Sequence, residues 1–131
     1  MAQLFGCVGA LYGALGVMLG AFGAHALRDT LSTRALEVWA TAVNYQMIHA
    51  LALLAVFLLM RHASASDLEV SMSLKIAGWA FVVGVLLFSG SLYALSFGAP
   101  GLFGPITPLG GVSFIVGWIS LAVAIFSLHD G

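Results

Sequence analysis

Residues 4–24 read LFGCVGALYGALGVMLGAFGA and contain no charged side chain. A helix of this length, roughly 30 Å at 1.5 Å per residue, crosses the hydrocarbon core of a bilayer. Helix is the expected conformation because unpaired backbone N–H and C=O groups cannot be left in hydrocarbon. Three more stretches, 38–60, 76–97 and 109–128, are similarly long and apolar. The sequence predicts an all-α protein, an integral membrane four-helix bundle forming a single transmembrane domain over residues 1–131.

The composition agrees with this class. Hydrophobic residues make up 62% of the 131 residues and charged residues 7%, whereas soluble domains are roughly half apolar and about a quarter charged. The net charge of -1 provides no basic field, so we expect membrane lipid as a partner and no nucleic acid. The single cysteine, Cys7, cannot form an internal disulfide, and we interpret it as a buried, inert thiol.

The first stretch has one alternative interpretation, a cleaved signal peptide. Residues 24–26 read AHA and resemble a cleavage site. However, residues 1–3 contain no Lys or Arg, and the apolar run exceeds the usual length of about 7–15 residues. We therefore expect the stretch to remain as a membrane span.

Local signals mark two helix starts. Ser66 and Glu69 have the spacing of a capping box, which predicts a helix starting near Asp67. Thr107 followed by Pro108 fits an N-cap and a proline at the first helical position, where the missing N–H costs nothing. This pair predicts the start of the last helix.

The charges specify the orientation of the chain poorly. Four spans place both termini on one side of the membrane, and the connections carry two Lys or Arg residues on each side: Arg28 and Arg34 against Arg61 and Lys75. The last connection, residues 98–108, has no charge, which favours its translocation and both termini in the cytoplasm.

The first span contains the most regular pattern in the chain. Its glycines are spaced alternately by three and four residues, which aligns them on one face: Gly6, Gly9, Gly13, Gly16, Gly20 and Gly23. Such a glycine zipper lets helices approach closely, so we interpret it as a helix-packing seam within the bundle or between subunits. A glycine-lined pore or ligand groove is the alternative. Six aligned glycines exceed what one neighbouring helix needs, so we also expect a homo-oligomer.

The second span carries the densest polar cluster. At 100° per residue, five polar residues fall within an arc of about 140°, with a sixth just beyond it: Glu37, Thr41, Asn44, Tyr45 and His49, then Gln46. Polar groups are costly in hydrocarbon, so the arc is expected to point into the bundle as a polar intramembrane site. Residues 50–60 would then be free to face lipid or neighbours. Trp118, deep in the last span, is expected to pack within the bundle.

His49 has two interpretations. It is a neutral imidazole hydrogen-bonded within the bundle, through Tyr45 or a hydroxyl of Ser89, Ser91 or Tyr93, or it serves a proton relay or a polar ligand. No two of the four histidines (His25, His49, His62 and His129) have the spacing of zinc helices, so we expect no metal. His25, Glu37 and His49 form no catalytic constellation, and we predict no enzyme activity and no cofactor.

Four segments carry a family resemblance: GAFGAHA at 20–26, WATAVNYQMIHALALL at 39–54, GSLY at 90–93 and ITPLGG at 106–111. In order and spacing, they resemble the signature segments of the YgdD-type family of small multi-pass membrane proteins. The resemblance implies four spans, a bacterial inner-membrane location and no established activity. It supplies no catalytic or binding residues.

Two classes of function follow from these patterns. In the first, the protein is a structural or interaction module that packs through the glycine seam. In the second, it binds or transports a small solute or a proton along the polar arc of the second span. The sequence names neither a ligand nor a protein partner.

Overall fold

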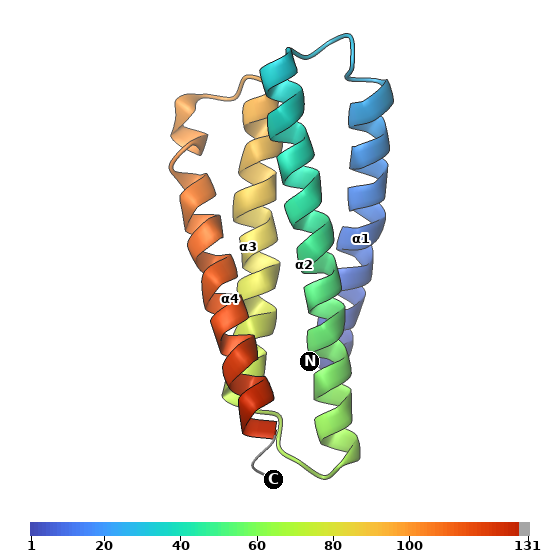
Figure 1. Ribbon diagram of the computed structural model, residues 1–131, viewed down its shortest axis with the longest axis vertical. Coiled ribbons are helices and arrows are strands. Elements are labelled where there is room, and N and C mark those ends of the chain that lie inside the picture. The colour runs from blue at the N-terminus through green and yellow to red at the C-terminus, as the bar shows by residue number, and fades with distance from the viewer. Residues whose placement is uncertain (129–131) are drawn as a thin grey trace.

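The computed structural model describes residues 1–128, which form four long helices and one short one (Figure 1). The helices are α1 (Ala2–His25), α2 (Thr33–Ala65), α3 (Met72–Ser96), the 3-10 turn η1 (Gly101–Phe103) and α4 (Ile106–Leu128). All four α-helices are long and apolar enough to cross a membrane. The predicted all-α membrane fold is therefore confirmed, and each predicted span coincides with one helix.

The helices extend beyond the predicted spans, most of all α2. Its 33 residues correspond to about 50 Å, longer than the hydrocarbon core of about 30 Å. The side chain of Ser32 caps its start by accepting a hydrogen bond from the amide of Ala35 at 3.1 Å. Because the cap lies six residues before residue 38, α2 reaches the water side as a regular helix.

The predicted capping box at Ser66 is wrong. Ser66 is the C-cap of α2, and Asp67 adopts a left-handed φ of 55°, which ends that helix. The α3 helix begins at Met72, where Ser71 is the N-cap and its hydroxyl accepts from the amide of Leu74 at 3.2 Å. Several serines precede α3, and the chain uses the one that leaves room for the reversal after α2.

The predicted cap at Thr107 is also wrong. The α4 helix begins at Ile106, so Thr107 and Pro108 lie inside its first turn. The hydroxyl of Thr107 lies 2.6 Å from the hydroxyl of Ser91 on α3 and is hydrogen-bonded to it. Thr107 therefore joins two helices instead of capping one.

The helices pack in the order of the chain. The closest pairs are α1 with α2, α2 with α3, and α3 with α4. Figure 1 shows α2 and α3 between α1 and α4, with the start of α1 and the end of α4 at the same end as the α2–α3 connection. The two central helices are accordingly the more buried ones.

Aromatic rings packed on glycines bring the helices together. A side chain at Gly78 of α3 would collide with the ring of Phe5 from α1. In the same way, a side chain at Gly84 of α3 would collide with the ring of Phe114 from α4. One at Gly117 of α4 would collide with the ring of Phe81 from α3. These contacts build the core, in which Phe5, Phe81 and Leu53 are fully buried.

The single cysteine lies outside this core. Cys7 is exposed on α1, so the expectation of a buried thiol is wrong. The glycine face of α1 is the one that meets α2, and Cys7 lies on another face.

Candidate functional site

The inward face of α2 carries Gln46 and His49, two of the five buried polar residues within residues 1–128, and the other three are serines of α3. Eight of the ten buried residues of α2 are again spaced alternately by three and four: Trp39, Ala42, Gln46, His49, Leu53, Val56, Met60 and Ala63. We call this set the inner stripe. Its upper half contains an indole, an amide and an imidazole, and its lower half is apolar.

The inner stripe contradicts the predicted rotation of α2. Four members of the predicted polar arc are exposed: Glu37, Thr41, Asn44 and Tyr45. Only His49 and the peripheral Gln46 are buried, each 3% exposed. Residues 50–60 were expected to be free to face lipid or neighbours, and two of them, Leu53 and Val56, lie in the core. The physical reason is that α2 packs against α1 and α3 on two sides, and its large apolar residues fill the space between them.

Gln46 connects three helices. Its Nε2 donates to the carbonyl oxygen of Tyr12 on α1 at 2.8 Å, and its Oε1 accepts from the hydroxyl of Tyr93 on α3 at 2.6 Å. The amide thus uses a donor and an acceptor at once. The sequence carries a signal for this position, because Gln46 lies seven residues from both Trp39 and Leu53.

His49 of α2 is hydrogen-bonded both to its own helix and to α4. Its Nδ1 lies 2.6 Å from the carbonyl oxygen of Tyr45, and the indole Nε1 of Trp118 donates to its Nε2 at 3.0 Å. A carbonyl oxygen can only accept, so we assign the proton to Nδ1. The Trp118 N–H can only donate, which leaves Nε2 as an acceptor. The imidazole is therefore neutral in this arrangement.

Aromatic rings surround His49. The ring of Phe114 stacks on the imidazole with centroids 3.6 Å apart and an interplanar angle of 8°. The ring centroid of Phe81 on α3 lies 5.5 Å from that of the imidazole. The hydroxyls that the sequence offered as partners bind elsewhere: Ser89 donates to the carbonyl of Ala42, Ser91 pairs with Thr107 and Tyr93 donates to Gln46. Trp118 carried no sequence signal as a partner of His49.

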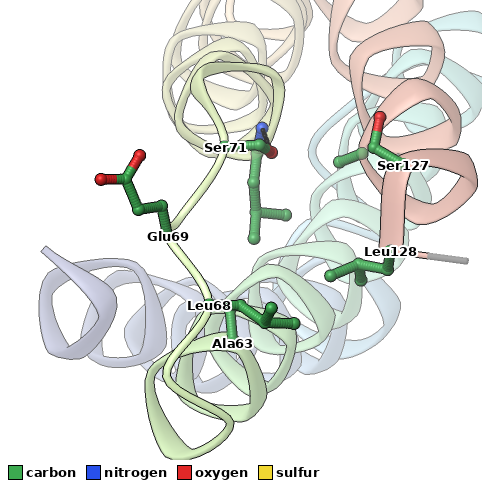
Figure 2. A pocket seen from close by; sticks show the side chains of 8 residues that line it. Ala63, Leu68, Glu69, Ser71, Ser127 and Leu128 are labelled. Atoms are coloured by element: carbon green, nitrogen blue, oxygen red, sulfur yellow. Dashed lines mark hydrogen bonds between the residues drawn. The ribbon is translucent and has the colours of Figure 1, made fainter. Parts of the chain in front are cut away.

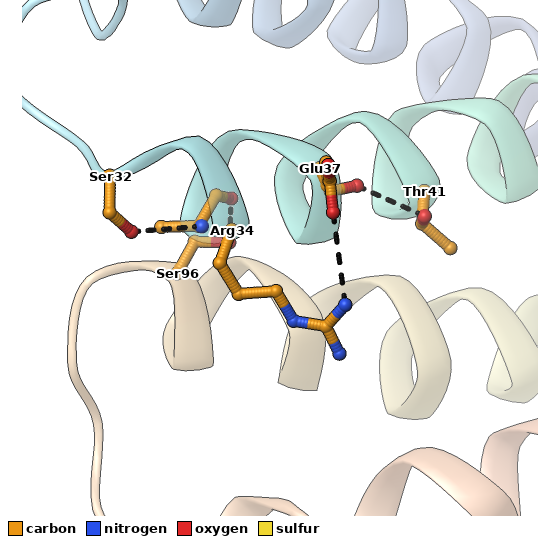
Figure 3. Close-up of polar contacts among 6 residues, drawn as sticks. Ser32, Arg34, Glu37, Thr41 and Ser96 are labelled. Carbon is orange, nitrogen blue, oxygen red and sulfur yellow. Dashed lines mark hydrogen bonds and ion pairs between the residues drawn. The ribbon is translucent and has the colours of Figure 1, made fainter.

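The outer polar residues of α2 do not join this site. Figure 3 shows Glu37 paired with Arg34 one turn earlier, at 3.8 Å, and the hydroxyl of Thr41 donating to the backbone carbonyl of Glu37 at 3.0 Å. Ser96 of α3 donates to the carbonyl of Ala35 at 3.2 Å beside them. These contacts lie at the water-facing start of α2.

The six glycines of α1 all face α2. A Cβ atom added at any of these glycines would lie near a residue of α2. The neighbours are Phe57 for Gly6, Ala50 and Leu53 for Gly9, and Ala50 for Gly13. They are Met47 for Gly16, Val43 for Gly20 and Trp39 for Gly23. The indole N–H of Trp39 donates to the carbonyl of Leu19 on α1 at 2.8 Å. The glycine face is thus occupied by a helix of the same chain, and an interface between subunits has to use another surface.

The polar groups of the core are paired throughout the described chain. The hydroxyl of Tyr12 donates to the carbonyl of Val82, and that of Ser113 to the carbonyl of Ala80. Within residues 1–128, every buried side-chain nitrogen or oxygen atom has a hydrogen-bond partner. The core therefore satisfies its polar groups without water.

A pocket of about 140 Å³ lies at the water-facing end of the bundle (Figure 2). The end of α2, the start of α3 and the end of α4 surround it. It is lined by Ala63, Leu68, Glu69, Ser71, Leu74, Ala124, Ser127 and Leu128. The hydroxyl of Ser71 caps α3, and that of Ser127 donates to the carbonyl of Val123. Both hydroxyls thus serve their own helices, and the rest of the lining is apolar apart from Glu69.

Residues 1–128 contain no cluster of side chains that could bind a metal ion. No three His, Cys, Asp or Glu side chains of this part of the chain lie close enough together to hold an ion. His49 is buried in the bundle, whereas His25 and His62 are exposed near helix ends. His129 lies outside the described residues.

Comparison with known proteins places the sequence among membrane proteins. A family model described as "Protein of unknown function (DUF423)" matches residues 19–111. The UPF0382 membrane protein YwdK of Bacillus subtilis is 46% identical over 122 residues, 93% of this chain and 95% of the relative. The UPF0382 membrane protein SSP2132 of Staphylococcus saprophyticus is 40% identical over 126 residues, 96% of this chain and 99% of the relative.

A third relative aligns over a shorter part of the chain. A UPF0382 membrane protein of Haemophilus influenzae is 44% identical over 105 residues, 80% of this chain and 79% of the relative. No solved structure matches the fold. The names of these relatives agree on a membrane location and give no activity.

Proposed function

We propose that this chain, which belongs to the DUF423 family of membrane proteins of unknown function, acts as a membrane-embedded interaction module. In this role the four helices form a closed scaffold, and their outward faces bind a partner. The alternative is a path for protons or small solutes along the polar residues of α2: Glu37, Thr41, Asn44, Tyr45, Gln46 and His49.

The hydrogen bonding of the buried polar side chains favours the interaction module over a path for solutes. Every buried polar side-chain atom of residues 1–128 is paired within the chain. A path for solutes needs polar groups that exchange partners with the passing species. In this bundle Gln46 is engaged at both ends of its amide, and both ring nitrogens of His49 have partners.

The packing around His49 supports the same proposal. Phe114 covers one face of the imidazole, and Trp118 both occupies Nε2 and packs against the ring at 5.8 Å. A proton relay requires a ring nitrogen that is free to accept or release a proton. Both ring nitrogens of His49 are instead engaged, one by the carbonyl of Tyr45 and the other by the indole N–H of Trp118.

A homo-oligomer in the cell membrane is part of the proposal. Helical bundles belong to the cell membrane, which is the inner membrane in bacteria that have two, whereas outer membranes hold β-barrels. The neutral connection at 97–105 favours termini in the cytoplasm. Reporter fusions at the C-terminus, one active only in the cytoplasm and one only outside it, test this orientation. Activity of the external reporter would reverse it.

Flux measurements test the function. The purified protein is placed in liposomes that contain a pH-sensitive dye, and a pH gradient is imposed. We expect the same rate of internal pH change as in protein-free liposomes. The rate at which the liposomes re-swell after stopped-flow mixing with hyperosmotic glycerol, which reports glycerol entry, should likewise be unchanged. An ionophore added at the end shows that the dye responds.

The opposite result would support the alternative function. Suppose that the protein accelerates proton or glycerol flux and that His49→Gln or Gln46→Leu abolishes the acceleration. The polar groups of α2 would then form a path, and the interaction module would be rejected.

A further inference from the structure

The outward face of α2 carries a second regular stripe. We call Thr41, Asn44, Ile48, Leu51, Ala55 and Leu58 the outer stripe; their spacing alternates between three and four residues, and all six are exposed. Leu51 is 65% exposed and Leu58 63%. This alternation keeps the residues on one narrow face, which is the pattern that packs against another helix.

Asn44 lies on this stripe inside the hydrocarbon. Gly13 of α1 faces Ala50 of α2, and the apolar run 4–24 is centred at Ala14, so the bilayer midplane crosses α2 near Ala50. Asn44 precedes Ala50 by six residues. It therefore lies about 9 Å from the midplane, within a hydrocarbon half-thickness of about 15 Å.

The amide of Asn44 has no partner in the described chain. None of the side-chain hydrogen bonds among residues 1–128 involves it. Thr41 on the same stripe is satisfied by its own helix, through the carbonyl of Glu37. The amide of Asn44 offers two N–H donors and one acceptor, which hydrocarbon cannot satisfy. The side chain is too short to reach the lipid headgroups, so the occupant of this face has to supply a donor and an acceptor at this depth.

We propose that the outer stripe is the interface of a parallel homodimer in which Asn44 of one copy pairs with Asn44 of a second copy. The inference rests on the proposed interaction module and names its partner. A carboxamide complements itself, and copies inserted with the same orientation place Asn44 at the same depth. A two-fold axis along the membrane normal then brings the two amides together. A single Asn in a heptad stripe also fixes the parallel register.

Charges continue the stripe toward water. Arg34 precedes Glu37 by three residues, and their side chains are 84% and 64% exposed, at a separation of 3.8 Å (Figure 3). In the parallel dimer the two Glu37 side chains lie at the same depth, and the Arg34 of the same chain accompanies each of them. The intrahelical pair therefore offsets the repulsion between like charges at the water-facing end of the interface.

Disulfide trapping tests the interface directly. In a Cys7→Ser background, Leu51→Cys is compared with Ile119→Cys on α4, which is 61% exposed and so equally accessible. After oxidation in native membranes, we expect a covalent homodimer for Leu51→Cys and monomer for Ile119→Cys. Equal trapping of the two variants, or none at position 51, would overturn the proposal. So would an adduct of Leu51→Cys with a different protein only.

Substitution of Asn44 tests the amide. In lipid nanodiscs, Asn44→Leu should raise the dimer dissociation constant by about three- to thirtyfold, the range expected for an interhelical hydrogen bond in a membrane. Asn44→Gln, which retains an amide, should raise it less. Thermal unfolding of the monomer, measured in detergent at a protein concentration below the dissociation constant, should not fall, because the side chain makes no bond within the described chain. An unchanged dissociation constant for Asn44→Leu refutes the pairing.

The two proposals fail separately. Monomeric wild-type protein in nanodiscs, together with silent flux assays, contradicts the dimer alone. Protein-dependent flux contradicts the interaction module whatever the dimer measurements give.

Discussion

The indole Nε1 of Trp118 on α4 donates a hydrogen bond of 3.0 Å to Nε2 of His49 on α2. This bond joins the two helices across α3, which packs against both of them. It also fixes the tautomer of the imidazole, because the opposite nitrogen faces the carbonyl of Tyr45. His49 is thus part of the framework that holds α4 in place.

Replacing Trp118 by Phe should destabilise the bundle. The change removes the donor and leaves Nε2 of His49 buried and unpaired, which costs about 1–3 kcal/mol of unfolding free energy. Trp79→Phe is the matched control, since Trp79 is 45% exposed against 44% for Trp118, and its indole makes no hydrogen bond within the described chain. Thermal unfolding in one detergent compares them. Equal losses for the two variants would show that the bond to His49 contributes nothing.

Gln46 and Tyr93 should be energetically coupled. Their hydrogen bond of 2.6 Å joins α2 to α3. A double-mutant cycle with Gln46→Leu and Tyr93→Phe should give a coupling of about 0.6–1.7 kcal/mol, as for other interhelical bonds in membranes. Gln46→Leu combined with Ser113→Ala is the control, because Ser113 bonds to the carbonyl of Ala80 and shares no partner with Gln46. Additive losses for Gln46 and Tyr93 would contradict the bridge.

Two glycines of α1 should respond oppositely to alanine. A Cβ atom at Gly9 would lie 3.0 Å from the carbonyl oxygen of Ala50, which is backbone and cannot move aside. Gly9→Ala should therefore cost about 1–3 kcal/mol. At Gly13 the nearest atom is the Cβ of Ala50 at 4.0 Å, so Gly13→Ala should be neutral or gain up to about 1 kcal/mol of helix propensity. Melting temperatures that fall equally would place α1 differently against α2.

Adjacent glycines of α4 provide the same test for the contact with α3. A Cβ atom at Gly110 would lie 2.7 Å from the Cα of Phe88, whereas one at Gly111 would meet no atom within 4 Å. We expect Gly110→Ala to lower the melting temperature and Gly111→Ala to leave it unchanged or raised. A lower melting temperature for Gly111→Ala alone would require α4 to be rotated on its axis.

The spans could be predicted from the sequence, but the helix starts could not. The length of an apolar run, such as 4–24, is set by the bilayer and is readable directly. By contrast, Ser66 and Ser71 both offer a capping hydroxyl, and only the geometry of the turn at Asp67 selects Ser71. Local spacing alone does not decide between them.

The rotation of α2 depends on its neighbours. Counting polar residues pointed the side that carries Asn44 inward, but in the structure Leu53 and Val56 are the residues packed in the core. The inner stripe from Trp39 to Ala63 is present in the sequence. Choosing it over the outer stripe requires knowing that α2 is central. The pairing of His49 with Trp118 further depends on how α4 docks through Gly110 and Gly117, which the sequence does not specify.

The polar groups inside this bundle are paired with one another, and the tautomer of His49 reports this pairing. Solid-state ¹⁵N nuclear magnetic resonance of histidine-labelled protein in lipid bilayers distinguishes protonated from unprotonated ring nitrogens. We predict one neutral form for His49, with the proton on Nδ1 and with Nε2 close to the indole N–H of Trp118. A proton on Nε2, or exchange of its signal with water, would contradict the account.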